Sequence, residues 1–121
     1  KNKKRARLQI YKIKQMILYN VTISIDENVE QKWLQWMKST HIPDVMRTDC
    51  FMECKLSKIN GEEEGGKTYA IMYTCESEEK MNLYQTKFSP ALQKDHSRLF
   101  SGKFAAFRTF LDVIETFDGK S

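Results

Sequence analysis

Residues 16–25, Met-Ile-Leu-Tyr-Asn-Val-Thr-Ile-Ser-Ile, decide the fold class because two kinds of side chain alternate along them. One set of alternate positions is wholly apolar: Ile17, Tyr19, Val21, Ile23 and Ile25. The other set is mostly polar: Leu18, Asn20, Thr22 and Ser24. A period of two residues is typical of a strand that buries one face against a core. The sequence therefore predicts a first strand over 16–25.

The segment after this strand has the pattern of a helix. Asp26 is a favourable N-cap residue, and acidic side chains follow in the first turn. Apolar residues then recur at helical spacing, at Val29, Trp33, Trp36 and Met37. The helix is expected to end at His41-Ile42-Pro43, because the residue before a proline disfavours the helical conformation.

A hairpin and a second helical region follow. Cys50–Ile59 and Lys67–Cys75 read as strands joined by a turn at 60–66. Ser77 is expected to cap another helix, and Ser89-Pro90 to begin a further one that stops near Gly102. Phe104–Phe117 is predicted as the last strand, with Phe107, Leu111 and Val113 facing the helices.

The order of these elements is β-α-β-β-α-β. It predicts an α+β fold of the ferredoxin-like type, a four-stranded antiparallel sheet with the helices on one face. The expected single domain covers residues 16–121.

Charge is unevenly distributed along the 121 residues. The formal net charge is +4, but residues 1–15 carry seven Lys or Arg and no acid, which leaves the rest at −3. We interpret residues 1–15 as a basic N-terminal extension outside the fold, with a phosphate-binding arm as the alternative. The body is mildly acidic, which argues against nucleic acid as a partner.

Several functional classes lack their sequence signals. The chain has no glycine-rich nucleotide loop and no Gly-x-Ser-x-Gly motif, and no cofactor is expected. Cys50, Cys54 and Cys75 lack the spacing of a zinc site, so we expect no metal and free thiols in a reducing cytoplasm. No run approaches the roughly 18 apolar residues of a membrane span.

RNA-recognition motifs share the same element order, so RNA binding is an alternative function for this fold. Their third strand carries stacking aromatics at set positions. Ile71 and Thr74 stand where two of those aromatics belong, and Tyr69 and Tyr73 fall on the face assigned to the helices. RNA binding is therefore disfavoured.

The sheet face turned away from the helices is expected to mix apolar and polar side chains. Four strands supply it: Leu18, Asn20, Thr22 and Ser24; Phe51, Glu53, Lys55 and Ser57; Thr68, Ala70, Met72 and Thr74; Arg108, Phe110, Asp112 and Ile114. An exposed patch of this kind favours pairing with a second copy, hence a homodimer of the dimeric α+β-barrel type.

We place the candidate ligand site on that same face. Its residues are Arg108, His41, Asn20, Thr22 and Thr74. Polar groups within an apolar lining are typical of a pocket for a small hydrophobic or anionic ligand, and Arg108 would hold the anionic group. The alternatives are an ion pair of Arg108 with Asp112, a capping role for His41 at its helix end, and a packing role for His96.

Four stretches together resemble a bacterial family of unknown function, DUF4286: 16–22 (MILYNVT), 33–37 (WLQWM), 41–45 (HIPDV) and 104–111 (FAAFRTFL). The resemblance implies a small cytoplasmic ferredoxin-like protein with no established activity. The His-x-Pro at the end of the first helix also resembles dimeric α+β-barrel proteins, some of which line their cavity with a histidine near this position.

Two classes of function stay open. One is a homodimeric small-molecule-binding or regulatory protein. The other is a cofactor-free monooxygenase or isomerase of the dimeric α+β-barrel type.

Overall fold

A computed structural model describes residues 16–61 and 65–119. The expected N-terminal extension and residues 62–64 of the expected turn lie outside the described residues. The strands are β1 (Ile17–Asp26), β2 (Glu53–Lys58), β3 (Gly66–Cys75) and β4 (Phe104–Asp112). The helical turns between β1 and β2 are η1 (Glu27–Val29), α2 (Glu30–Trp36), η2 (Met37–His41) and α3 (Ile42–Met46). Those between β3 and β4 are α4 (Glu78–Leu83), η3 (Tyr84–Phe88) and α5 (Ser89–Phe100).

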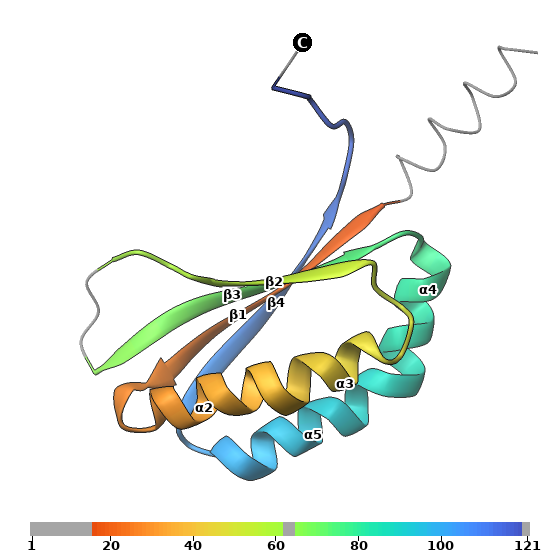
Figure 1. The fold of residues 1–121 in the computed structure, drawn as a ribbon. Coiled ribbons are helices and arrows are strands. Elements are labelled where there is room, and N and C mark those ends of the chain that lie inside the picture. The colour runs from red at the N-terminus through yellow and green to blue at the C-terminus, as the bar shows by residue number, and fades with distance from the viewer. Residues whose placement is uncertain (1–15, 62–64, 120–121) are drawn as a thin grey trace, which may run out of the picture.

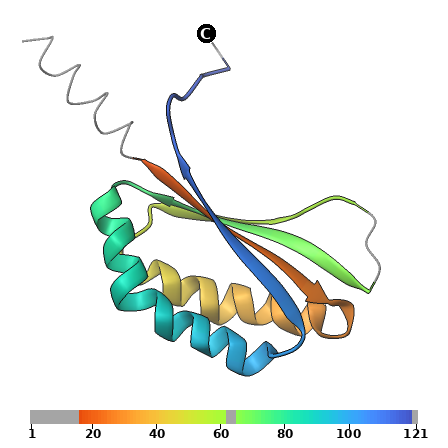
Figure 2. The ribbon, with the colours of Figure 1, turned by 180° about the vertical axis from the view of Figure 1, so that it is seen from behind.

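The strands form one antiparallel sheet in the order β2-β3-β1-β4. Both helical segments lie on the same face of this sheet, and the opposite face carries no layer of described residues (Figure 1, and from behind in Figure 2). This is the α+β, ferredoxin-like arrangement that the element order predicts. No helix among the described residues has the length and apolar character of a membrane span.

The core lies between the sheet and the helices. The apolar set of β1 is buried there as the alternation predicts, and Tyr69, Ile71, Tyr73 and Cys75 of β3 join it. Trp33 of α2 is fully buried and Phe100 of α5 nearly so, which fixes both helical segments against the sheet. The predicted caps also form: Asp26 Oδ1 accepts the Asn28 N–H at 2.8 Å, and Ser77 Oγ accepts the Lys80 N–H at 3.1 Å.

Both helical segments run through the positions where the sequence predicts breaks. Each has a widened turn just before its proline, at η2 before Pro43 and at η3 before Pro90. Proline has no N–H to donate and its ring collides with the carbonyl four residues earlier. The preceding residue donates five residues back instead, Ile42 to the Met37 carbonyl and Ser89 to the Tyr84 carbonyl. The expected helix end at His41-Ile42-Pro43 is thus a wide turn inside a helix that ends at Met46.

The predicted orientation of the last strand is wrong. In the β1–β4 register Arg108 lies opposite Val21 and Phe110 opposite Tyr19, and directly opposed residues share a face. Arg108, Phe110 and also Asp112 therefore project toward the helices, and Phe107 and Leu111 project from the open face. Alternation could not decide this, because both alternate sets of residues 104–111 contain apolar side chains.

Two smaller expectations also change. Phe51, expected on the open face, is buried on the helix side with its ring centroid 4.7 Å from that of Tyr84. It precedes the first residue of β2, so the alternation of that strand does not govern it. The last strand ends at Asp112 rather than at residue 117. Asp112 pairs with Ile17, the first residue of β1, and the pairing of the two strands stops there.

The close approach of Gly66, the first residue of β3, to β1 gives a test of the pairing between these two strands. A Cβ at Gly66 would lie 2.9 Å from the Ile25 carbonyl oxygen, whereas one at Gly61 would meet nothing within 4 Å. We predict that Gly66→Ala lowers the free energy of unfolding by about 1–3 kcal/mol relative to Gly61→Ala, because backbone must shift. Urea denaturation measures both, and equal stabilities would contradict the pairing.

Candidate functional site

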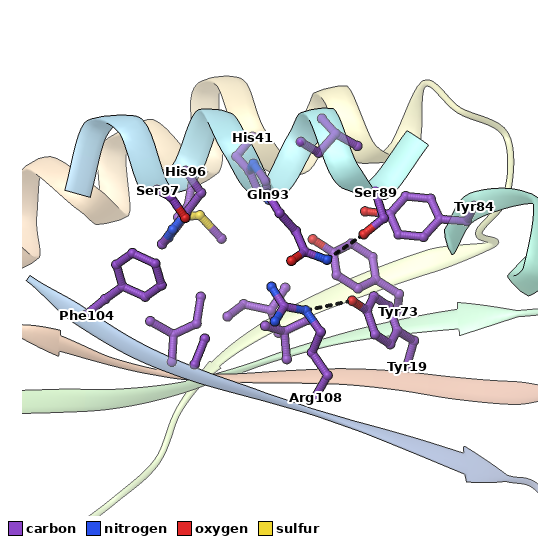
Figure 3. Close-up of a pocket in the computed structure, with 16 residues that line it drawn as sticks. Tyr19, His41, Tyr73, Tyr84, Ser89, Gln93, His96, Ser97, Phe104 and Arg108 are labelled. Atoms are coloured by element: carbon purple, nitrogen blue, oxygen red, sulfur yellow. Dashed lines mark hydrogen bonds between the residues drawn. The ribbon is translucent and has the colours of Figure 1, made fainter. Parts of the chain in front are cut away.

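A pocket of about 180 Å³ lies inside the fold, between the helices and the sheet (Figure 3). Side chains from β1, β3 and β4 form its floor and side chains from η2, η3 and α5 its roof. Two lining residues, Ser97 and Arg108, are exposed to solvent, which places the opening between α5 and the edge strand β4. The lining is mixed: Tyr19, Val21, Ile23, Met37, His41, Ile71, Tyr73, Tyr84, Ser89, Leu92, Gln93, His96, Ser97, Phe104, Ala106 and Arg108.

Arg108 supplies the charge of this pocket. Its Nε donates to the Tyr19 hydroxyl oxygen at 3.1 Å, which fixes the base of the guanidinium, and the head projects toward α5 (Figure 3). Within the described residues no carboxylate lies at ion-pair distance from the Arg108 guanidinium, so the ion pair with Asp112 that the sequence offered as an alternative does not form. The two terminal nitrogens of Arg108 are thus available to a ligand.

His96 is held as a neutral imidazole. The indole Nε1–H of Trp33 donates to His96 Nε2 at 2.8 Å, so the ring's own proton belongs on Nδ1. The ring meets Phe104 edge-on, with centroids 4.3 Å apart. Burial, together with the neighbouring His41 and Arg108, lowers the pKa of His96 to about 4. The packing role expected for His96 describes these contacts, but the residue also lines the pocket.

His41 lies beside His96 at the end of the widened turn η2. Its ring stacks on Trp36 with centroids 5.0 Å apart, and the His96 centroid is 5.8 Å away. Burial lowers the pKa of His41 to about 4; Asp44 and Asp95 oppose this shift and Arg108 adds to it. No hydrogen bond among the described residues engages either nitrogen of His41, so a neutral, unengaged imidazole faces the pocket at pH 7.

Hydroxyl and amide groups complete the polar part of the lining. Gln93 Nε2 donates to Ser89 Oγ at 2.7 Å on the roof formed by α5 (Figure 3). Burial raises the pKa of Tyr73 and of Tyr84, so both phenols stay protonated at neutral pH. The pocket therefore offers hydrogen-bond donors within aromatic walls.

The structure divides the predicted site residues between the two faces of the sheet. Arg108 and His41 line the helix-side pocket. Asn20, Thr22 and Thr74 lie on the open face, where Asn20 Nδ2 donates to Thr22 Oγ1 at 3.0 Å. The prediction that these five residues share the open face is therefore wrong, and for Arg108 the reason is that the register of β4 is one residue from the one assumed.

Several lining residues were missed by sequence reasoning. The sequence pattern predicts Tyr19, Tyr73 and Tyr84 only as core residues, although each brings a hydroxyl into the interior. A buried tyrosine hydroxyl needs a partner, so tyrosines on the helix-facing stripe were the signal of a polar cavity on that side. Within residues 16–61 and 65–119, no group of three or more His, Cys, Asp or Glu is placed to hold a metal ion.

A family model described as a domain of unknown function, DUF4286, matches residues 16–114. The chain belongs to the DUF4286 family. The resemblance seen in the sequence is thereby confirmed over nearly the whole of the described fold. No curated protein sequence matched this DUF4286 chain.

Solved structures share the fold of this DUF4286 chain. A putative antibiotic biosynthesis monooxygenase from Bacillus cereus is 13% identical, with a TM-score of 0.61 over 87% of this chain and 99% of that one. A monooxygenase from Streptomyces coelicolor, in complex with nanaomycin D, is 14% identical, with a TM-score of 0.58 over 90% and 96%. A dimeric ferredoxin-like protein from an uncultured marine organism is 12% identical, with a TM-score of 0.52 over 84% and 99%. At these identities the likeness shows the fold alone.

The two lowered histidine pKa values predict how stability depends on pH. An unfolded histidine titrates near 6.5, whereas His41 and His96 titrate near 4 in the folded chain. Between these values the unfolded state binds more protons, so we predict that the contribution of the two histidines to the free energy of unfolding falls as the pH drops from about 6.5 toward 4.

Proton NMR measures the two histidine pKa values directly, because the chain has two histidines and both line the pocket. Their ring protons are expected to keep neutral chemical shifts down to about pH 5 in the native protein and to titrate near 6.5 in urea. A native titration near 6.5 for either ring would contradict the burial described here.

Proposed function

We propose that this DUF4286 protein binds a small molecule in the pocket between its helices and its sheet. The observation that carries the proposal is Arg108, a permanent charge without a carboxylate partner among the described residues, at the opening of a cavity lined by aromatic, aliphatic and polar side chains. Aromatic walls with a few convergent polar groups are the usual composition of a ligand site. The Streptomyces coelicolor monooxygenase of the same fold is described in complex with a ligand, which supports this reading.

Filling the pocket tests the proposal. Ala106 lies on its floor and Ala91 is exposed on α5 outside it, so Ala106→Leu and Ala91→Leu make a matched pair. The probes are four single-ring compounds: phenol, aniline, benzamide and benzoate. We predict that at least one shifts the ring resonances of His41 and His96, and that Ala106→Leu abolishes the shift while Ala91→Leu preserves it. If none of the four moves either histidine, the pocket is not a site for small ring compounds.

The open face of the sheet supports a second part of the proposal, a homodimer. Phe107 is 63% exposed and Leu111 39% exposed on this face, next to the partly exposed Leu18 and Met72. Apolar side chains exposed on an uncovered sheet face favour burial against another copy. One solved structure of this fold is itself described as dimeric.

Light scattering tests the dimer. We predict a mass of twice the 14.3 kDa chain at micromolar concentration. Phe107→Glu should shift the equilibrium to monomer, because burying an unpaired carboxylate costs several kcal/mol. Leu99→Glu is the control, since Leu99 is 45% exposed on α5, away from that face. A monomeric wild type, or a Phe107→Glu variant that stays dimeric, would contradict this interface.

His41 favours a second candidate function, an enzyme of the cofactor-free monooxygenase or isomerase type. A neutral imidazole without a hydrogen-bond partner among the described residues can take a proton from a bound substrate, and the nearby guanidinium would stabilise the anion formed. Two solved structures of this fold are described as monooxygenases, one of them putative.

Tautomerisation of phenylpyruvate tests that second candidate, because it needs only the movement of a proton. The loss of enol absorbance should be faster with the wild-type protein than in buffer. His41→Asn should remove the acceleration, and the exposed-site variant Lys94→Gln should keep it. Equal rates for the wild type and His41→Asn would exclude His41 as the base in this reaction.

A further inference from the structure

We infer that the ligand of the pocket is a small aromatic acid, one planar ring bearing a carboxylate that is held by Arg108. This inference rests on the proposed binding function and names its ligand class. Three features of the pocket lead to it: the state of the guanidinium, the electrostatics of the lining and the volume.

The guanidinium of Arg108 is fixed for a two-pronged contact. Its Nε is engaged by the Tyr19 hydroxyl at 3.1 Å, and this bond restrains the planar head while leaving both terminal nitrogens without a partner among the described residues. An arginine side chain cannot lose its proton, and a carboxylate matches two of its N–H groups at once. Lysine or histidine at this position would not offer that geometry.

The pocket carries net positive charge at neutral pH. None of its lining residues is acidic, and its two histidines are neutral. The charge of Arg108 is felt in the opposite layer of the pocket, where it adds to the lowering of the pKa of His41 and His96 that burial causes. Asp44 and Asp95 act on His41 but are not part of the lining. An entering anion therefore meets a favourable potential.

The volume sets the size of the ligand. A dry cavity of about 150 Å³ in another protein accepts benzene, and this pocket measures about 180 Å³. One ring with a small substituent fills a volume of this size. Phe104 and Tyr73 supply aromatic surface on either side of Arg108 in the close-up (Figure 3). A ring between them gains offset or edge-to-face contacts.

A comparison of three probes separates charge from ring. Benzoate has both, benzamide has the ring without the charge, and acetate has the charge without the ring. Each is titrated into the full chain and followed by the His41 and His96 ring resonances. We expect benzoate to bind at least about tenfold more tightly than benzamide, the effect of one charge-assisted hydrogen-bonded pair. We expect a similar advantage of about tenfold over acetate, because only benzoate buries an apolar ring. Benzoate should also raise the pKa of His41, because it places a negative charge near that ring, and benzamide should not.

Matched variants assign the effect to Arg108. Arg108→Gln should weaken benzoate about tenfold or more and leave benzamide unchanged. Lys94→Gln removes the same charge from the exposed side of α5 and should change neither affinity. Arg108→Lys keeps the charge without the fork and should lie between the wild type and Arg108→Gln.

Any other outcome contradicts one part of the inference: the carboxylate, the ring or the binding function on which both rest. Equal affinities for benzoate and benzamide in the wild type would overturn the acid while leaving the binding function standing. Acetate as tight as benzoate would overturn the ring and indicate a simple anion site. No response of the histidine resonances to any of the four ring compounds named above would overturn the binding function itself, and this inference with it.

Discussion

The register in which β4 pairs with β1 determines what the pocket contains. With Arg108 opposite Val21, the guanidinium enters the space between sheet and helices, and a slip of one residue would send it to the open face and bring Phe107 inside. Backbone bonds hold this register at both ends of the strand pair, from Asp26 N–H to the Lys103 carbonyl at 2.8 Å and from Val113 N–H to the Met16 carbonyl at 3.0 Å. The ring of Phe110 adds a stack on Tyr19 at 5.1 Å.

The two prolines shape the roof over that floor. Pro43 and Pro90 each prevent a normal helical hydrogen bond, and each helix continues through a wide turn instead of ending. Wide turns of this kind are rare and recur at functional sites. Here they bear lining residues, Met37 and His41 in one and Tyr84 in the other. The hydrogen bond from Trp33 to His96 then ties the two helical segments together beside the pocket, which His96 lines.

The fold could be predicted from the sequence because its strongest signals are local. The alternation of residues 17–25, the caps at Asp26 and Ser77 and the order of elements each depend on neighbours in the chain. The position of the pocket could not be predicted from the sequence, for two physical reasons. The side of the sheet on which Arg108 lies depends on the pairing of β4 with β1, which is almost ninety residues earlier in the chain. The sequence of β4 does not decide it, because both alternate sets of residues 104–111 contain apolar side chains. The continuation of the helices past Pro43 and Pro90 depends on packing that compensates for the lost bonds, which no propensity reveals. Arg108 and His41 were chosen for their chemistry and so were named, but on the wrong face of the sheet.

The central claim is that the ligand site lies on the helix side of the sheet and not on its open face. Methionine methyl NMR with benzoate as the probe tests it most directly, because Met37 lines the pocket and Met72 lies on the open face. The account predicts that benzoate shifts the Met37 methyl resonance, and that ring protons of benzoate show cross-relaxation to it, while Met72 stays unchanged. A shift and cross-relaxation at Met72 with none at Met37 would contradict it.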